Sequence, residues 1–182
     1  CNFGSAEEPW NKIEDGYTWI QQVPVEDRVH GVRGPATRAE SEIIMMCGLP
    51  GCGKTVWCHK YAKENPDKVY NILGTNDIID KMKVQGLPRR KNYHGRWDVL
   101  IKMSTICLNK LLSKTSSKAR NVVIDQTNVY PSAQKRKLRP FTGIKRRAVV
   151  IVPTDEEFKK RVEKREKEEG KDVPESALLE MK

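Results

Sequence analysis

Residues 43–55 read IIMMCGLPGCGKT, an apolar run that passes directly into a glycine-rich loop ending in Lys-Thr. A short continuous apolar run that stops at such a loop is typical of a buried parallel strand. The glycines allow backbone N–H groups to turn inward around a phosphate, and a helix after the loop adds the positive end of its dipole. The stretch therefore predicts a strand, a phosphate-binding loop and a helix in succession.

The loop matches the complete Walker A pattern in the strand-to-helix context that this pattern requires. It consists of Gly48, Leu49, Pro50, Gly51, Cys52, Gly53, Lys54 and Thr55. We expect Lys54 to reach the β- and γ-phosphates of ATP, and the Thr55 hydroxyl to ligate Mg²⁺. ATP and Mg are therefore the predicted cofactors.

A second apolar run, at 121–125, ends in a carboxylate. An apolar strand that ends in an acid is the second part of such a phosphate site, so we expect Asp125 to orient the metal directly or through water. The following Asp-Gln-Thr-Asn sequence is also good capping chemistry, and Asp125 as a turn cap is the alternative. We favour the metal site.

Apolar runs alternate with helical patterns from Glu42 onward. We expect strands at 43–47, 69–73, 121–125 and 147–152, and helices at 54–65, 76–85, 96–113, from 131, at 155–169 and from 174. In the 96–113 helix the apolar period assigns the core-facing side to Val99, Leu100, Met103, Ile106, Cys107 and Leu111. Strands separated by helices predict an α/β fold of the P-loop NTPase type, with a parallel sheet and helices on both faces.

Residues 1–41 differ from the rest in composition, because they combine proline, glycine and scattered aromatics with no helical period. Trp10, Tyr17 and Trp19 are too apolar for a free tail, so we expect them to pack on the domain. The chain begins with Cys1, which indicates a piece of a longer protein. We place the domain boundary between 1–41, an end segment plus linker, and 42–182, the P-loop domain. No apolar run reaches the roughly 18 residues of a membrane span.

The chain carries 34 Lys and Arg against 24 Asp and Glu, a net charge of +10. The basic residues form two clusters, and the candidate nucleic-acid contacts are Arg89, Arg90 and Lys91 in one and Lys135, Arg136 and Lys137 in the other. Tyr93, Trp97, Tyr130 and Phe141 lie within or near these clusters. Bases stack on such rings while phosphates meet the cations, so RNA or another single-stranded nucleic acid is the predicted partner. A merely basic, soluble surface is the alternative.

Several of these motifs occur together in a known family. The P-loop, Tyr70-Asn71-Ile72, Asp125-x-Thr127-Asn128 and Lys160-Arg161-x-x-Lys164-Arg165 resemble the 5′-hydroxyl polynucleotide kinases. That likeness implies that Arg161 and Arg165 lie on a lid helix and contact the nucleotide phosphates. From the charge pattern alone, those two arginines belong to a solvated helix surface.

The chain is still more similar to the heterogeneous nuclear ribonucleoprotein U family, and to its U-like members in particular. Residues 70–76, 125–130 and 169–174 carry this likeness. The opening Cys-Asn-Phe-Gly resembles the last strand of the SPRY domain that precedes the kinase-like domain in that family. The resemblance implies a nuclear, RNA-associated protein with RNA-processing partners, in which residues 1–41 end a SPRY domain.

One departure from the kinase pattern decides the predicted activity. Active polynucleotide kinases place an aspartate, which accepts the proton of the attacking hydroxyl, where this chain has Thr75. A threonine cannot accept that proton near neutral pH, and positioned acid–base catalysis is worth about 10²–10⁴-fold. Asp77 is a weak alternative base, because helix geometry is expected to turn it elsewhere as an ordinary first-turn carboxylate. We therefore predict an ATP-binding pseudokinase; an active 5′-hydroxyl polynucleotide kinase and a slow ATPase switch are the alternatives.

Overall fold

The computed structural model describes residues 18, 20–28, 31–84, 87–88 and 95–169, with the backbone alone at 83–84, 87–88, 97 and 165–169. It divides into two compact units, Cys1–Gly31 and Val32–Lys182. The described part of the first contains the 3₁₀ turns η2 (Ile20–Gln22) and η3 (Val25–Asp27). The expected packing of Trp10, Tyr17 and Trp19, and the helix expected from Pro174, lie outside the described residues.

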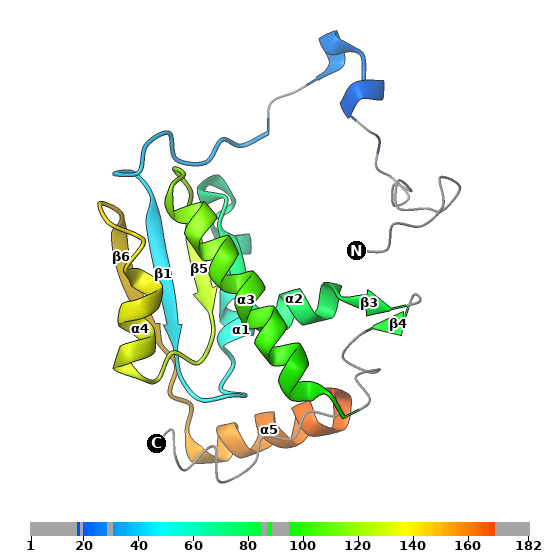
Figure 1. Cartoon of the computed structure of the whole chain (residues 1–182), viewed down its shortest axis with the longest axis vertical. Helices are drawn as coiled ribbons and strands as arrows, with labels where there is room; N and C mark the ends of the chain where they lie inside the picture. Colours follow the sequence, from blue (N-terminus) through cyan, green and yellow to red (C-terminus); the bar gives the residue numbers. More distant parts are fainter. Residues whose placement is uncertain (1–17, 19, 29–30, 85–86, 89–94, 170–182) are drawn as a thin grey trace. The chain divides into compact units, whose positions relative to one another are not determined.

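The second unit alternates strands and helices, as Figure 1 shows. Its strands are β1 (Glu42–Cys47), β2 (Asn71–Gly74), β3 (Lys83–Val84), β4 (Leu87–Pro88), β5 (Val122–Asp125) and β6 (Lys145–Val150). Its helices are α1 (Lys54–Glu64), η4 (Pro66–Lys68), α2 (Thr75–Lys81), α3 (Trp97–Ser116), α4 (Pro131–Leu138) and α5 (Asp155–Glu169). Four strands form one sheet in the order β2-β5-β1-β6, with every neighbouring pair parallel. The predicted α/β fold is confirmed.

Side chains alternate between the two faces of β1, because successive residues of a strand point to opposite sides. On one face, Ile43 and Met45 join a core with Leu108 and Leu112 of α3. On the other, Ile44 and Met46 pack with Cys58 of α1. Figure 1 shows α3 and α4 in front of the sheet. Helices therefore cover both faces, which explains why the β1 sequence is continuously apolar.

The segment after β2 departs from the expected single long helix. Helix α2 ends at Lys81, and Met82 has extended backbone angles. Strands β3 and β4 then pair antiparallel as a short hairpin. Gly86 and Pro88 in this stretch are the poorest helix formers, so the helix predicted over 76–85 was too long.

Helix α3 buries a different row of side chains from the one the sequence suggested. Its buried positions are Leu100, Ser104, Leu108, Leu112 and Ser116, spaced four apart. Of the side chains we assigned to the core, Leu100 alone is buried; Val99, Met103, Ile106, Cys107 and Leu111 are exposed. The core assignment was therefore wrong, because two apolar rows compete on this helix and the row that includes the two serines faces the sheet.

Candidate functional site

The loop between β1 and α1 requires glycine for steric reasons. Gly48, Gly51 and Gly53 have φ angles of 146°, 85° and 105°, values that side-chain-bearing residues rarely adopt. A Cβ on Gly48 would stand 2.7 Å from the Ile151 carbonyl oxygen. The Gly48 N–H donates to the Thr127 carbonyl at 2.9 Å, which fixes the start of the loop to the segment after β5. The sequence thus builds a tight loop that ends where α1 begins.

Lys54 opens α1 and turns back into the loop. Only 7% of it is exposed. Its Nζ donates to the carbonyl of Gly48 at 3.0 Å and to that of Leu49 at 2.7 Å, and lies 3.7 Å from the Cys52 Sγ. Two hydrogen bonds to loop carbonyls therefore hold the ammonium group of Lys54 inside the loop. A cation at that position beside inward-turning N–H groups is the arrangement that binds phosphate oxygens.

Thr55 and Asp125 meet across the end of the sheet. The Thr55 hydroxyl donates to Asp125 Oδ2 at 2.6 Å, and Asp125 is 5% exposed. Mg²⁺ is bound by one or two protein oxygens together with waters and substrate phosphates, and this pair supplies such a donor set. Within the described residues no group of three His, Cys, Asp or Glu could hold a metal. The site therefore fits Mg²⁺ shared with a nucleotide and not an all-protein metal cage.

The end of β2 lies against the end of β5. A Cβ on Gly74 would stand 2.7 Å from the Asp125 carbonyl oxygen, so the two backbones approach closely. Thr75 follows as the first residue of α2, and its Oγ1 accepts a hydrogen bond from Gln126 Nε2 at 3.4 Å. The strand end beside Asp125 is therefore followed by a hydroxyl side chain.

Asp77 lies in the first turn of α2, two residues after Thr75. Burial raises its pKa, the Asp125 carboxylate raises it further, and His59 acts in the opposite direction. The pKa of the Cys58 thiol on α1 is raised to about 12, chiefly by burial and then by Asp125 and Asp77. Both carboxylates thus raise the pKa of the same thiol. Asp77 lies in the first turn of α2, where the sequence placed it as a first-turn carboxylate, and its role as a base stays a prediction.

Helix α5 packs onto the loop between β1 and α1. Arg161 donates to the Cys52 carbonyl and to the Glu157 carboxylate, one helical turn before it. A Cβ on Gly51 would stand 3.3 Å from Val162. The structure thus brings Arg161 to the loop, and Glu157, which the sequence did not single out, orients it. The side chain of Arg165 is outside the described part of the structure, although its position four residues on shares this face.

Of the two predicted basic clusters, the structure describes the one on α4 alone. Arg89, Arg90 and Lys91 lie outside the described residues. On α4, Lys135 and Arg136 are exposed, whereas Lys137 turns inward and donates to Asn128 Oδ1 at 2.6 Å. Of the nearby aromatics, Tyr130 is 45% exposed.

Phe141 cannot serve as a stacking ring, because it is 1% exposed and belongs to the core. The sequence placed it near the basic cluster, but could not show that it packs inward against α3. The exposed basic face of α4 is therefore smaller than the composition suggested.

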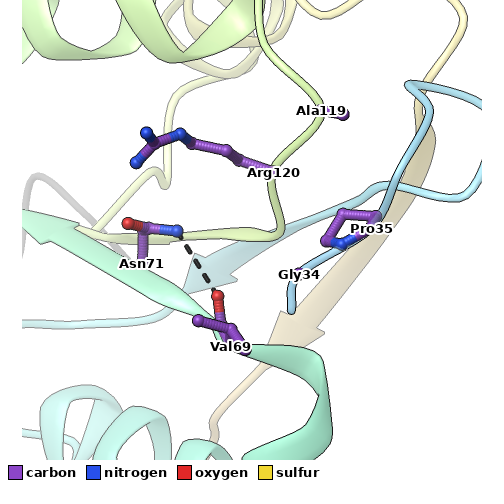
Figure 2. A pocket seen from close by; sticks show the side chains of 6 residues that line it. All are labelled: Gly34, Pro35, Val69, Asn71, Ala119 and Arg120. Atoms are coloured by element: carbon purple, nitrogen blue, oxygen red, sulfur yellow. Dashed lines mark hydrogen bonds between the residues drawn. The ribbon is translucent and has the colours of Figure 1, made fainter. Parts of the chain in front are cut away.

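A hollow of about 250 Å³ lies at the opposite, amino-terminal ends of the strands. Figure 2 shows its lining residues, Gly34, Pro35, Val69, Asn71, Ala119 and Arg120. None of the predicted site residues lines it. In the described residues no helix is long and apolar enough to cross a membrane.

The comparisons with known proteins agree with this geometry. Residues 43–182 match the family model described as AAA domain. Heterogeneous nuclear ribonucleoprotein U-like protein 2 of Homo sapiens is 46% identical over 181 residues, and that of Mus musculus is 45% identical over 181 residues. Each alignment covers 100% of this chain and 24% of the relative, so the chain spans about a quarter of the length of these curated relatives. The predicted resemblance to U-like proteins is confirmed.

Two solved structures share the fold. The Pnkp1/Rnl/Hen1 RNA repair complex aligns with a TM-score of 0.57 and 17% identity, over 87% of this chain and 45% of that one. The PezAT toxin–antitoxin system of Streptococcus pneumoniae aligns with a TM-score of 0.59 and 18% identity, over 75% and 56%. Likeness at these identities concerns the fold alone, and it agrees with a P-loop α/β domain.

Proposed function

We propose that this chain, which belongs to the AAA domain family, is an ATP-binding module that holds ATP with Mg²⁺ and does not transfer the γ-phosphate efficiently. One observation carries the proposal. The Lys54, Thr55 and Asp125 constellation is assembled at the ends of β1 and β5, while the adjacent end of β2 presents the Thr75 hydroxyl in place of a carboxylate.

In the proposed complex the loop glycines direct N–H groups toward the phosphates. Lys54 exchanges its bonds to the Gly48 and Leu49 carbonyls for phosphate oxygens. Thr55 and Asp125 would hold the metal, which neutralises phosphate charge when bound. Arg161 reaches the same loop from α5 and adds a further positive charge. Each of these residues contributes to binding of ATP or Mg²⁺. None of them would remove the proton from a hydroxyl that receives the γ-phosphate.

Proton removal is the missing step. A hydroxyl that attacks the γ-phosphate must lose its proton, and a positioned carboxylate contributes about 10²–10⁴-fold to such a step. Thr75 is held by Gln126 and offers a weakly acidic hydroxyl in that place. ATP bound here would then serve as a structural ligand or a switch, which stabilises the folded chain by mass action.

The setting of the module is part of the proposal. The relatives are named as nuclear ribonucleoproteins, so we place the parent protein in the nucleus, bound to RNA and to RNA-processing proteins. We place a SPRY domain before this one, ending within residues 1–41. Lys135 and Arg136 are the exposed candidates for contacts with RNA phosphates.

Equilibrium binding of ATP with Mg²⁺, measured by calorimetry, tests the first half of the proposal. We expect saturable binding with one site, lost in Lys54→Ala and retained in Lys60→Ala, whose side chain lies exposed on α1. Equal affinity of the two variants would reject the loop as the nucleotide site.

An active 5′-hydroxyl polynucleotide kinase is the second candidate, and the position of Asp77 favours it. Asp77 lies two residues after Thr75 in the first turn of α2, and burial and Asp125 raise its pKa, so it is the candidate for accepting the proton that Thr75 cannot. Steady-state transfer of label from γ-labelled ATP to a 5′-hydroxyl oligoribonucleotide separates the candidates. Transfer well above that of Lys54→Ala would favour the kinase, and phosphate release without oligonucleotide would indicate an ATPase.

A further inference from the structure

Asn128 lies directly behind the phosphate loop, in an unusual conformation. Its φ of 46° is positive, a region in which asparagine is one of the few tolerated residues besides glycine. The residue is 2% exposed. A buried side chain with an uncommon backbone conformation must be held by its surroundings, so its hydrogen bonds show what it connects.

On the loop side, Asn128 secures the end of β1. Its Nδ2 donates to the Met46 carbonyl at 2.7 Å, two residues before Gly48. The carbonyl of the preceding residue, Thr127, accepts the Gly48 N–H at 2.9 Å. The turn 127–128 therefore fixes both the strand that enters the loop and the first N–H of the loop.

On the other side, Asn128 receives two bonds from α4. Lys137 Nζ donates to its Oδ1 at 2.6 Å, and Gln134 Nε2 donates to its backbone carbonyl at 2.7 Å. Gln134 Nε2 also lies 4.0 Å from the Cys47 Sγ, at the end of β1. Positions 134 and 137 are three apart, so they share one helix face, and that face points to the loop.

The charge of Lys137 acts at the same place. Burial, and to a smaller extent the charge of Arg136, lower its pKa to about 8. The pKa of Cys47 is raised by burial, and the ammonium groups of Lys137 and Lys54 both oppose that rise. Two lysines from different helices therefore lower the pKa of the same thiol, that of Cys47, immediately before Gly48. The sequence grouped Lys137 with the exposed cations beside it, whereas these contacts direct it toward the loop.

We propose that Lys137 is a positioning residue of the nucleotide site, which acts through Asn128 to fix the start of the phosphate loop, and not a nucleic-acid contact. This inference rests on the proposed nucleotide binding. Its neighbour Arg136 is exposed on the same short helix and supplies the natural control. The two adjacent cations are assigned opposite roles.

The test compares Lys137→Met with Arg136→Met. Calorimetry measures the affinity for ATP with Mg²⁺, and fluorescence anisotropy measures binding of single-stranded RNA over a salt series. We expect Lys137→Met to weaken nucleotide binding about tenfold or more, since a hydrogen bond from a charged group is lost. We expect Arg136→Met to leave nucleotide affinity within about twofold and to lower the salt slope of RNA binding by about one.

A second variant separates positioning from general stability. Lys137→Arg keeps the charge but replaces a compact ammonium by a planar fork, which cannot reproduce the short bond to Asn128. A nucleotide-positioning lysine then loses ATP affinity while the unfolding midpoint without nucleotide stays near that of the parent. An RNA-contact lysine would tolerate arginine in both assays.

The inference is overturned if Lys137→Met and Lys137→Arg bind ATP like the parent, or if Lys137→Met lowers the RNA salt slope as Arg136→Met does. Should Lys137→Met fail to fold, Lys137→Arg decides alone. Absence of ATP binding by the parent chain would instead reject the proposed function itself. The two failures are therefore distinguishable.

Discussion

The ends of β1 and β2 lie on either side of the same residue, Asp125, and they carry different residues. At the end of β1, three glycines, Lys54 and Thr55 form a complete phosphate-binding arrangement. At the end of β2, a single glycine permits close contact with β5, and a threonine follows. The first strand end carries the residues that we propose to hold phosphates, and the second carries the threonine that, in the proposed function, leaves transfer without its base.

In the proposed function, binding and transfer depend on different groups of the fold. The phosphate site depends on backbone geometry and fixed charges, all of which lie between β1, α1 and β5. Transfer of the γ-phosphate needs one further group, a base at a neighbouring strand that accepts the proton of the attacking hydroxyl. A chain can therefore lose the second without disturbing the first, and substitutions on the two sides should have separate effects.

The largest expected effect on the β1 side comes from Lys54→Ala. Removing an ammonium that contacts phosphates should cost about 3 kcal/mol, or roughly 100-fold in ATP affinity. Calorimetry with Mg²⁺ measures it, with Lys60→Ala as the control. A loss below about threefold would contradict the assigned role of Lys54.

Two glycine substitutions compare the strand ends directly. Gly48→Ala combines a φ of 146° with a Cβ 2.7 Å from the Ile151 carbonyl, so we expect the free energy of unfolding to fall by about 2 kcal/mol or more. Gly74→Ala meets the Asp125 carbonyl at 2.7 Å without an unfavourable φ, so its effect should be smaller. Urea unfolding measures both, and Gly34→Ala, with nothing within 4 Å, is the control. The reverse ranking would show that the β1 loop is less constrained than described.

Asp125→Asn tests the residue that the two strand ends share. An amide keeps the shape and can still accept from Thr55, but it is a weaker Mg²⁺ ligand than a carboxylate. We expect about a tenfold loss of ATP affinity with Mg²⁺ and little change when EDTA removes the metal. Equal losses under both conditions would reassign Asp125 to the turn-capping role.

The last expected effect is a dependence of stability on pH, which comes from a residue on the β1 side. The pKa of Lys137 lies near 8 in the folded chain, below its ordinary value of 10.5. The unfolded chain therefore binds more protons between these values, and this residue makes the free energy of unfolding rise as pH increases from about 8 to 10.5. Subtracting the urea-unfolding profile of Lys137→Met from that of the parent isolates the contribution. A difference that falls with pH would contradict the buried position of Lys137 beside Arg136 and Cys47.

The β1 side could be predicted from the sequence because its signal is local. The loop, its strand and its helix are contiguous, and each glycine is required where it occurs. Asp125 was predictable as well, since a buried strand that ends in a carboxylate is a short, clear pattern. The alternation of strands and helices then gave the parallel sheet.

What the sequence did not reveal depends on long-range packing. Two apolar rows on α3 are equally regular, and contact with the sheet alone decides that Leu108 is buried and Met103 is exposed. Lys137 looks like its neighbours in sequence, and its inward turn depends on Asn128, nine residues earlier, which is itself held against the end of β1. The positive φ of Asn128 had a weak signal, since asparagine tolerates that conformation.

The most direct test of the central claim is a single-turnover experiment. ATP labelled in its γ-phosphate is first bound to excess protein with Mg²⁺, and a 5′-hydroxyl oligoribonucleotide is then added. The account predicts that the parent chain transfers the label from ATP to RNA no faster than the Lys54→Ala variant does. This holds although the parent chain has bound the nucleotide. Rapid transfer of the label to RNA by the parent chain, abolished by Asp77→Asn, would contradict it and make the end of β2 a working catalytic site.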